Sequence, residues 1–217
     1  MALALFDLDN TLLADDSDFL WGCFLVDKGL VDKSTYDEAN KRFYDEYKQG
    51  TLNIFEFLAF SLKPLTLYPR EKLDVLHSEF MQKHIEPVMT EKGKKQIQLH
   101  RDKGDVIVII TATNSFVTGP IAEAFKVDAL IATDPEIING QYTGKVAGTP
   151  CFQEGKKTRL NHWLKNTSHN LDNSTFYSDS HNDISLLECV TTPVAVDPDD
   201  ELKATALERN WEIRSFR

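Results

Sequence analysis

The chain has 217 residues, enough for one large domain or for a core domain with an insertion. Its net charge of −10 argues against nucleic acid and anionic membranes as partners, because both require a basic surface. The three cysteines follow no metal-binding or disulfide pattern and fit a reducing compartment. The first residues lack the features of a signal peptide or a membrane span, so we expect a cytoplasmic protein.

A short apolar run, residues 2–6, predicts a buried strand that stops at two carboxylates, Asp7 and Asp9, followed by the hydroxyl of Thr11. Side chains alternate along a strand, so both carboxylates share one face if the extended backbone continues. Two adjacent acids are stable when a cation lies between them or when one takes a proton. Mg²⁺ is the natural cation, because it prefers hard oxygen ligands and is often bound by carboxylates together with a phosphate. The alternative is a solvated turn that caps a following helix.

Residues 17 to about 87 predict successive helices without a convincing strand between them. Ser17 or Asp18 is the expected cap of the first helix, and Ser34 that of the second. An all-helical block inside an α/β pattern predicts an inserted cap domain. We expect its aromatic residues Trp21, Phe43, Tyr44 and Tyr47 in the cap's own core and not in a pocket wall. The alternative is that these helices simply cover the sheet. The predicted division is a core of residues 1–14 and 88–217 and a cap of residues 15–87.

From residue 88 onward, strands and helices alternate. Residues 105–111 are almost entirely Val, Ile and Thr, as in a central parallel strand that is buried on both faces. The alternation predicts an α/β fold with a doubly wound parallel sheet, and a site at the carboxyl ends of its strands. Asp7, Thr111 and Asp179 all fall at such ends. Further strands are expected at residues 128–133, 174–178 and 193–196, and a hairpin with a turn at Asn139-Gly140. Helices are expected at residues 90–101, 115–125, 153–165 and 199–209.

Four segments in this order resemble the motifs of the haloacid dehalogenase superfamily of phosphohydrolases, in its phosphoserine phosphatase-like branch. The resemblance spans residues 3 to about 197. It implies a Rossmann-like core with a helical cap between the first and second motifs, and Mg²⁺-dependent hydrolysis of a phosphate monoester through an aspartyl-phosphate. The segments are Asp7-Leu8-Asp9-Asn10-Thr11, the strand that ends at Thr111, Lys156 with its neighbours, and Asp179 to Asp183.

The resemblance implies that Asp7 is the nucleophile and a metal ligand. Asp9 would be the general acid and base, and would also bind the metal through its backbone carbonyl. Lys156 would offset negative charge on the nucleophile and the phosphoryl oxygens, although the adjacent Lys157 leaves the register open. Asp179 would bind Mg²⁺ directly.

Residues of the second and fourth motifs would complete the phosphate site. Thr111, the amide of Ala112 and Asn182 would bind the transferring phosphoryl group, and Asp183 would bind the metal or a metal-bound water. In phosphoserine phosphatases two glycines follow the second-motif hydroxyl, whereas this chain has Ala112 and Thr113. This difference weakens the case for an identical substrate.

Substrate recognition rests on fewer residues. Asp16 lies nine residues after Asp7, and in the phosphoserine phosphatase branch an acid at this spacing contacts the substrate's amino group. Asp15 or Asp16 could do so here, which favours a small phosphorylated amine such as phosphoserine or histidinol phosphate. The same Asp16 also suits a helix cap. Arg42 or Arg70 in the helical block could bind a substrate carboxylate.

Two other functions share these residue types. One is a phosphotransferase or phosphomutase on the same fold. The other is a signalling receiver module, which also combines a phosphorylated aspartate, Mg²⁺, a threonine and a lysine, but whose acidic pair lies on a different strand from that aspartate. The sequence does not determine the oligomeric state or the physiological substrate.

Overall fold

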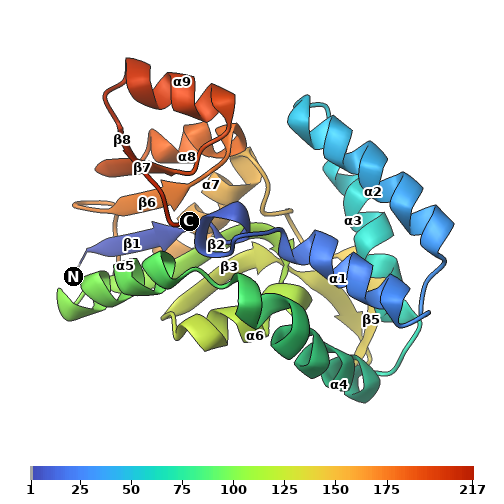
Figure 1. The fold of residues 1–217 in the computed structure, drawn as a ribbon. Coiled ribbons are helices and arrows are strands. Elements are labelled where there is room, and N and C mark those ends of the chain that lie inside the picture. Colours follow the sequence, from blue (N-terminus) through green and yellow to red (C-terminus); the bar gives the residue numbers. More distant parts are fainter. Residues whose placement is uncertain (1) are drawn as a thin grey trace.

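The computed structural model describes residues 2–217, and of Lys48 the backbone alone. Its centre is a six-stranded sheet with the strand order β3-β2-β1-β6-β7-β8, in which every neighbouring pair is parallel. The predicted α/β fold with a doubly wound parallel sheet is therefore confirmed (Figure 1). The strands are β1 (Leu3–Phe6), β2 (Val106–Asn114), β3 (Ala129–Thr133), β6 (Thr175–Ser178), β7 (Thr192–Val196) and β8 (Glu212–Arg214).

Helices cover both faces of this sheet, and the alternation of β1 shows why. Ala4 and Phe6 pack into the same core cluster as apolar residues of α5 and α6, whereas Leu3 and Leu5 pack with those of α7, α8 and α9. Successive side chains of a strand point to opposite faces, so an uninterrupted apolar run requires cover on both sides. These helices are α5 (Glu91–Asp102), α6 (Ser115–Phe125), α7 (Glu154–Lys165), α8 (Ile184–Leu187) and α9 (Asp200–Glu208).

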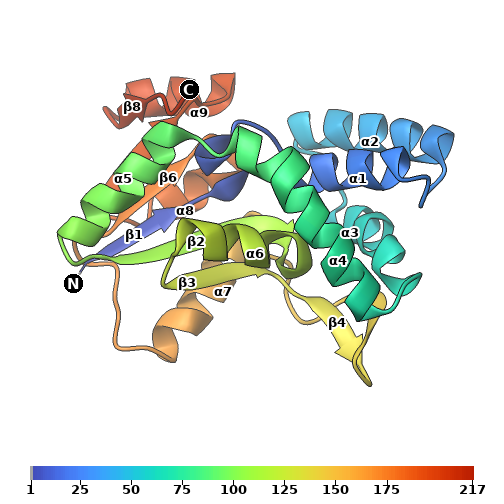
Figure 2. The same cartoon turned by 60° about the horizontal axis from the view of Figure 1, so that its bottom comes forward.

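Between β1 and α5 the chain forms a helical block that lies beside one end of the sheet in both ribbon views (Figures 1 and 2). The separation of this block from the core as a domain stays a prediction. No helix of the described residues is long and apolar enough to cross a membrane. The block comprises α1 (Ser17–Asp27), α2 (Lys33–Lys48), α3 (Ile54–Leu62), α4 (Arg70–Phe80) and the short turns Lys63–Thr66, Met81–Ile85 and Glu86–Val88.

The first helix is capped by Asp16, which the sequence offered as an alternative cap, and the cap of the second helix differs from the prediction. Asp16, not Ser17 or Asp18, has an extended backbone and accepts a hydrogen bond from the amide of Phe19. In the same way Asp32 caps α2 in place of Ser34. Carboxylates and hydroxyls are both good caps, so the sequence does not distinguish neighbouring candidates.

The predicted hairpin is present, but it lies with the helical block. Its strands are β4 (Pro135–Ile138) and β5 (Gln141–Val146), joined at Asn139 and Gly140, whose φ angles of 50° and 78° suit a two-residue hairpin turn. β5 packs against α3 and the turn Lys63–Thr66. The helical block therefore contacts a segment that is more than seventy residues away in the sequence and belongs to the predicted core.

The second-motif strand is longer than expected. β2 continues to Asn114, which caps α6 by accepting a hydrogen bond from the amide of Val117. Ala112 and Thr113 therefore belong to the end of a strand and not to a helix start.

Candidate active site

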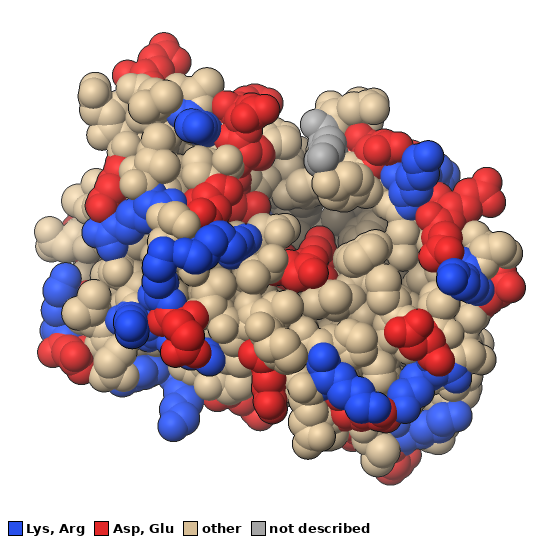
Figure 3. Space-filling model, viewed as in Figure 1, with Lys and Arg blue, Asp and Glu red and all other residues tan. Residues whose placement is uncertain are grey.

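A cavity of about 710 Å³ lies between the carboxyl edge of the sheet and the helical block. In the space-filling view it lies in the hollow between the two lobes (Figure 3). We call its two sides the sheet wall and the helical wall. The sheet wall consists of Asp7, Asp9, Thr111, Ala112, Thr113, Lys156, Asp179, Ser180, Asn182 and Asp183, and the helical wall of Asp15, Asp16, Asp18, Phe19, Cys23, Asp37, Asn40, Lys41, Phe43, Tyr44, Tyr47, Leu52, Ile54 and Phe57.

Lys156 joins the first and fourth motifs. Its Nζ atom lies 3.1 Å from Asp7 Oδ1 and 2.7 Å from Asp183 Oδ2. Gly155 makes this placement possible, because a Cβ atom there would lie 2.0 Å from the carbonyl oxygen of Pro150. Lys157 instead pairs with Glu154 at the surface. The structure therefore places Lys156, and not Lys157, beside the predicted nucleophile.

The contacts in this cluster shift the pKa values of Asp7 and Lys156. Burial raises the pKa of Asp7 well above its usual range, and the charge of Lys156 opposes that rise. Burial alone would lower the pKa of Lys156, but Asp183 and Asp7 outweigh it, and the net shift is upward. Ser178 also donates a hydrogen bond to Asp183, at 2.7 Å. Lys156 is thus a permanent cation held against the carboxylate of Asp7.

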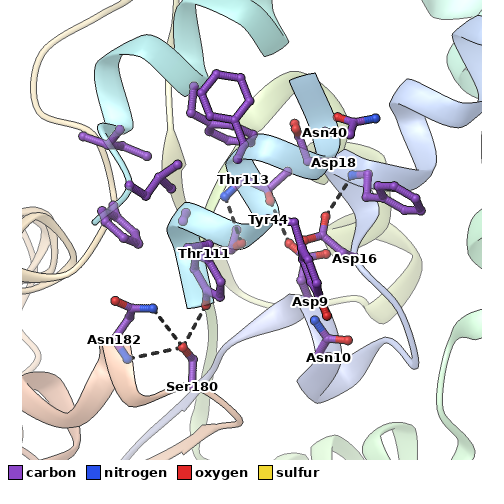
Figure 4. Close-up of a pocket in the computed structure, with 18 of the residues that line it drawn as sticks. Asp9, Asn10, Asp16, Asp18, Asn40, Tyr44, Thr111, Thr113, Ser180 and Asn182 are labelled. Carbon is purple, nitrogen blue, oxygen red and sulfur yellow. Dashed lines mark hydrogen bonds between the residues drawn. The ribbon is translucent and has the colours of Figure 1, made fainter. Parts of the chain in front are cut away.

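Asp9 lies beyond the regular strand with an extended backbone (φ −68°, ψ 136°), and the chain turns at the next residue. The strand ends at Phe6, and Asn10 has a positive φ of 56°. Asp9 Oδ1 accepts a hydrogen bond from the amide of Ser17 at 2.7 Å. Asp9 Oδ2 accepts one from the hydroxyl of Thr113, also at 2.7 Å (Figure 4). Burial, reinforced by the charge of Asp16, raises the pKa of Asp9 to about 7. A carboxyl group with such a pKa can give and take a proton near neutral pH.

Asp179 is tied to the first motif by Thr11, whose hydroxyl donates to Asp179 Oδ1 at 3.0 Å. Burial raises the pKa of Asp179 to about 7, Thr11 opposes the rise, and Asp183 adds to it. The first-motif threonine therefore has a structural partner across the sheet, which the sequence alone does not identify.

The donor chemistry of the acidic sheet wall fits Mg²⁺. Among residues 2–217, no three acidic, histidine or cysteine side chains form a ready metal-binding group by themselves. Asp7 is nevertheless a buried carboxylate and Asp179 a half-buried one, and the charge of Asp179 raises the pKa of Asp7. A hard divalent cation between them would relieve that repulsion. A site of this kind would need backbone or substrate oxygens as well.

The predicted phosphate-binding residues also lie on the sheet wall. The buried hydroxyl of Thr111 accepts a hydrogen bond from the amide of Thr113. The carbonyl of Ala112 accepts one from Thr133 Oγ1, which fixes the strand end. Asn182 accepts a hydrogen bond from Gln153 Nε2 at 2.7 Å and lies beside Ser180 (Figure 4).

The two residues predicted to determine specificity are placed differently. Asp16 lies on the helical wall, where burial, reinforced by Asp18, raises its pKa to about 6. Arg42 does not line the cavity: its guanidinium lies over the ring of Phe43 and pairs with Glu46. Arg70 lies over the ring of Tyr142, also outside the cavity. The structure thus brings Asp16 to the site but neither arginine, because Arg42 pairs with Phe43 and Glu46, and Arg70 lies over Tyr142 of β5.

Sequence reasoning misses several residues of the cavity. Tyr44 and Tyr47 were expected in the core of the helical block, yet both line the cavity, and the hydroxyl of Tyr47 hydrogen-bonds with that of Ser180 at 2.8 Å. Asp18 was treated as a helix cap, but it lines the cavity too. Their helical spacing does not distinguish a core-facing stripe from a cavity wall, because both lie on one face of a helix.

Comparison with known proteins agrees with this geometry. The family model described as haloacid dehalogenase-like hydrolase matches residues 4–188. A histidinol-phosphatase of Neisseria meningitidis is 42% identical over 219 residues, which cover 99% of each chain. The phosphoserine phosphatase SerB1 of Mycobacterium tuberculosis is 31% identical over 224 residues, all of this chain and 71% of that protein.

Solved structures show the same fold. A Bordetella pertussis protein described as of unknown function superposes with a TM-score of 0.94 at 42% identity, covering 100% of this chain and 99% of that one. A phosphoserine phosphatase with bound substrate superposes with a TM-score of 0.70 at 21% identity, covering 100% and 93%.

Proposed function

The chain belongs to the haloacid dehalogenase-like hydrolase family and is a phosphatase, and on this premise we propose that it hydrolyses a small phosphorylated amine through an aspartyl-phosphate on Asp7, with Mg²⁺ as cofactor. The observation that carries the proposal is the contact of Lys156 with Asp7 inside a cavity that Asp9, Thr111 and Asp179 also line. A fixed cation beside a buried carboxylate suits a nucleophile that receives a phosphoryl group.

In the first step a carboxylate oxygen of Asp7 attacks phosphorus, and the bond between phosphorus and the ester oxygen breaks. Asp9, in its protonated form, gives its proton to the departing oxygen. The pKa of about 7 gives Asp9 a substantial protonated fraction at neutral pH. Thr111 and Lys156 stabilise charge on the transferred group.

In the second step Asp9, now a carboxylate, takes a proton from a water molecule whose oxygen attacks phosphorus. The bond between Asp7 and phosphorus breaks, and inorganic phosphate and the free carboxylate of Asp7 result. Bound Mg²⁺ would neutralise phosphoryl charge and orient it. Asp7, Asp179 and the backbone carbonyl of Asp9 would hold the ion, with Asp183 in support.

The charge of the cavity supports an amine as substrate. Its basic lining residues are Lys156, which is already paired with Asp7 and Asp183, and Lys41, which lies on the exposed side of α2. An acidic cavity favours a cationic ligand, and among the two candidates this favours histidinol phosphate, which has no carboxylate, over phosphoserine. The acidic lining residues are Asp7, Asp9, Asp15, Asp16, Asp18, Asp37, Asp179 and Asp183.

A phosphate-release screen tests the proposal. The substrates are histidinol phosphate, phosphoserine, phosphoethanolamine, a sugar phosphate and a nucleotide, each with Mg²⁺ and with chelator. We expect Mg²⁺-dependent release that is fastest with histidinol phosphate. Turnover of phosphoserine at a higher kcat/KM, lost on Lys41→Ala, would show that Lys41 binds a carboxylate. Release that survives chelation would contradict the role of Mg²⁺, and transfer of phosphate to added sugars would indicate a phosphotransferase.

A further inference from the structure

Asp18 has no part in the chemistry just described, although it lines the cavity. It is the second residue of α1, and Figure 4 shows its carboxylate near those of Asp9 and Asp16. Asp9 serves proton transfer and Asp16 faces the expected amine. A third acid on the same side of the cavity therefore needs its own explanation.

Asn114 holds Asp18 in a defined orientation. The amide nitrogen Nδ2 of Asn114 donates to Asp18 Oδ1 at 3.2 Å. The other end of this amide is fixed, because Asn114 Oδ1 accepts a hydrogen bond from the amide of Val117 as the cap of α6. Asn114 is 2% exposed. A buried amide that is fixed at both ends thus presents the Asp18 carboxylate to the cavity.

The charge of Asp18 has no compensating base among the described side chains that act on it. Its strongest charged neighbour is Asp9, and the charges that act most on Asp16 are those of Asp18 and then Asp15. The hydrogen-bond donors near Asp18 are Asn114 and Ser61. Two uncompensated acids next to each other in a cavity complement a ligand that carries two positive charges.

Aromatic side chains line the same cavity as these acids. Phe19 and Tyr44 are 48% and 57% exposed, and both line the cavity together with Phe43 and Tyr47. A flat cation can form an ion pair with a carboxylate while its face lies against an aromatic ring. A long flexible ammonium chain would use the carboxylate alone.

We propose that Asp18 binds a second cationic group of the substrate, and that this group is a protonatable aromatic base. The substrate class is then a phosphate monoester that carries a primary amine, bound by Asp16, and a heterocyclic base, bound by Asp18, and that lacks a carboxylate. This inference rests on the proposed function and assigns the selectivity of the same cavity to a residue on α1.

Asp18→Asn tests the inference, because asparagine keeps the shape and can still accept the hydrogen bond from Asn114. We expect kcat/KM for histidinol phosphate, which has an amine and an imidazole, to fall roughly 10- to 100-fold, the cost of one charged contact. The fall in kcat/KM for phosphoethanolamine, which has the amine alone, should be smaller by a factor of about ten or more. Asp27→Asn, the same change on the exposed side of α1, is the matched control and should alter neither value.

The parent enzyme gives a second measurement that does not depend on the folding of a variant. Histidinol, ethanolamine and serine serve as competitive inhibitors without a phosphate. We expect histidinol to have an inhibition constant at least about tenfold below that of ethanolamine, and serine to gain nothing from its carboxylate. Equal inhibition by histidinol and ethanolamine would overturn the inference.

The outcomes separate the inference from the proposed function. Equal losses with both substrates in Asp18→Asn would show that Asp18 only ties α1 to Asn114, and would overturn the inference while the phosphatase assignment stands. Turnover of other monoesters without turnover of histidinol phosphate would also overturn it. Absence of phosphate release from every substrate would contradict the proposed function itself.

Discussion

The two walls of the cavity differ in how their charges are compensated. On the sheet wall Asp7 and Asp183 share the cation of Lys156, and Asp179 and Asp9 accept hydrogen bonds from the hydroxyls of Thr11 and Thr113. On the helical wall Asp16 and Asp18 face mainly other acids. Partnered acids keep a fixed geometry, as phosphoryl transfer requires. Acids without an opposite charge nearby can form an ion pair with a cationic ligand, and this pairing contributes to the free energy of binding.

We infer from this difference that the sheet wall carries out the chemical steps and that the helical wall selects the substrate. Variants of the sheet wall should impair catalysis with every substrate, whereas variants of the helical wall should affect substrates unequally. Four substitutions, two on each wall, test the roles assigned to these residues, from the largest expected effect to the smallest.

Asp9→Asn should lower kcat by about 10²- to 10⁴-fold with every substrate, because it removes the group that gives and takes the proton. Both formation and breakdown of the phosphoenzyme should slow. Rapid-quench kinetics with acid-trapped enzyme measures the two steps separately. An unchanged rate of either step would remove the acid–base role of Asp9 from that step.

Lys156→Met should lower kcat by about 10²- to 10³-fold. It should also destabilise the fold by about 3–5 kcal/mol, because Asp7 and Asp183 would be buried without their cation. Denaturant unfolding and phosphate release measure the two effects. Lys157→Met is the matched control next to it, and an equal effect there would contradict the assignment of Lys156.

Tyr47→Phe removes the hydroxyl that joins the helical wall to Ser180 on the sheet wall. One neutral hydrogen bond contributes about 1 kcal/mol, so kcat/KM should fall by about fivefold. Most of this loss should be in KM, since Tyr47 touches no reacting atom. Tyr68→Phe, outside the cavity, provides the control. A large loss in kcat alone would place Tyr47 in the chemical step.

Asp18→Asn should change stability in a pH-dependent way. Burial, reinforced by Asp9, raises the pKa of Asp18 to about 7, against about 3.9 in an unfolded chain. Between these values the folded state binds more protons, so the parent loses stability as the pH rises. The variant does not titrate there. Its Tm should exceed that of the parent by a few degrees at pH 8, and the difference should shrink toward pH 4.

Thermal unfolding across this pH range, without substrate, measures the difference. Asp27→Asn should show no such trend. A constant Tm difference at all pH values would mean that Asp18 is already charged throughout or is compensated by another group.

The sheet wall could be predicted from the sequence because its residues follow strands. A strand end fixes where a side chain lies, so the sequence pattern alone places Asp7, Thr111 and Asp179 at one edge of the sheet. Asp9 reaches the cavity with an extended backbone beyond the end of β1, and the turn with a positive φ at Asn10 follows it.

The helical wall could be predicted only in part, because it depends on how helices pack. Asp16 was identified by its spacing from Asp7. From the sequence, Tyr44 and Tyr47 were predicted to be core residues and Arg42 a substrate ligand. In the structure, the orientation of α2 about its axis places the two tyrosines in the cavity and Arg42 outside it. The contact of β5 with α3 joins segments that are distant in the sequence, and no local pattern encodes it.

The central claim is that phosphate passes through Asp7. Its most direct test is acid quenching of the enzyme during turnover of histidinol phosphate, followed by peptide mapping of the trapped phosphoryl group by mass spectrometry. The account predicts a phosphoryl group on Asp7, and a loss of roughly 10⁴-fold or more in phosphate release by a folded Asp7→Asn variant. A phosphoryl group on another residue, or turnover by Asp7→Asn at the parent's rate, would contradict it.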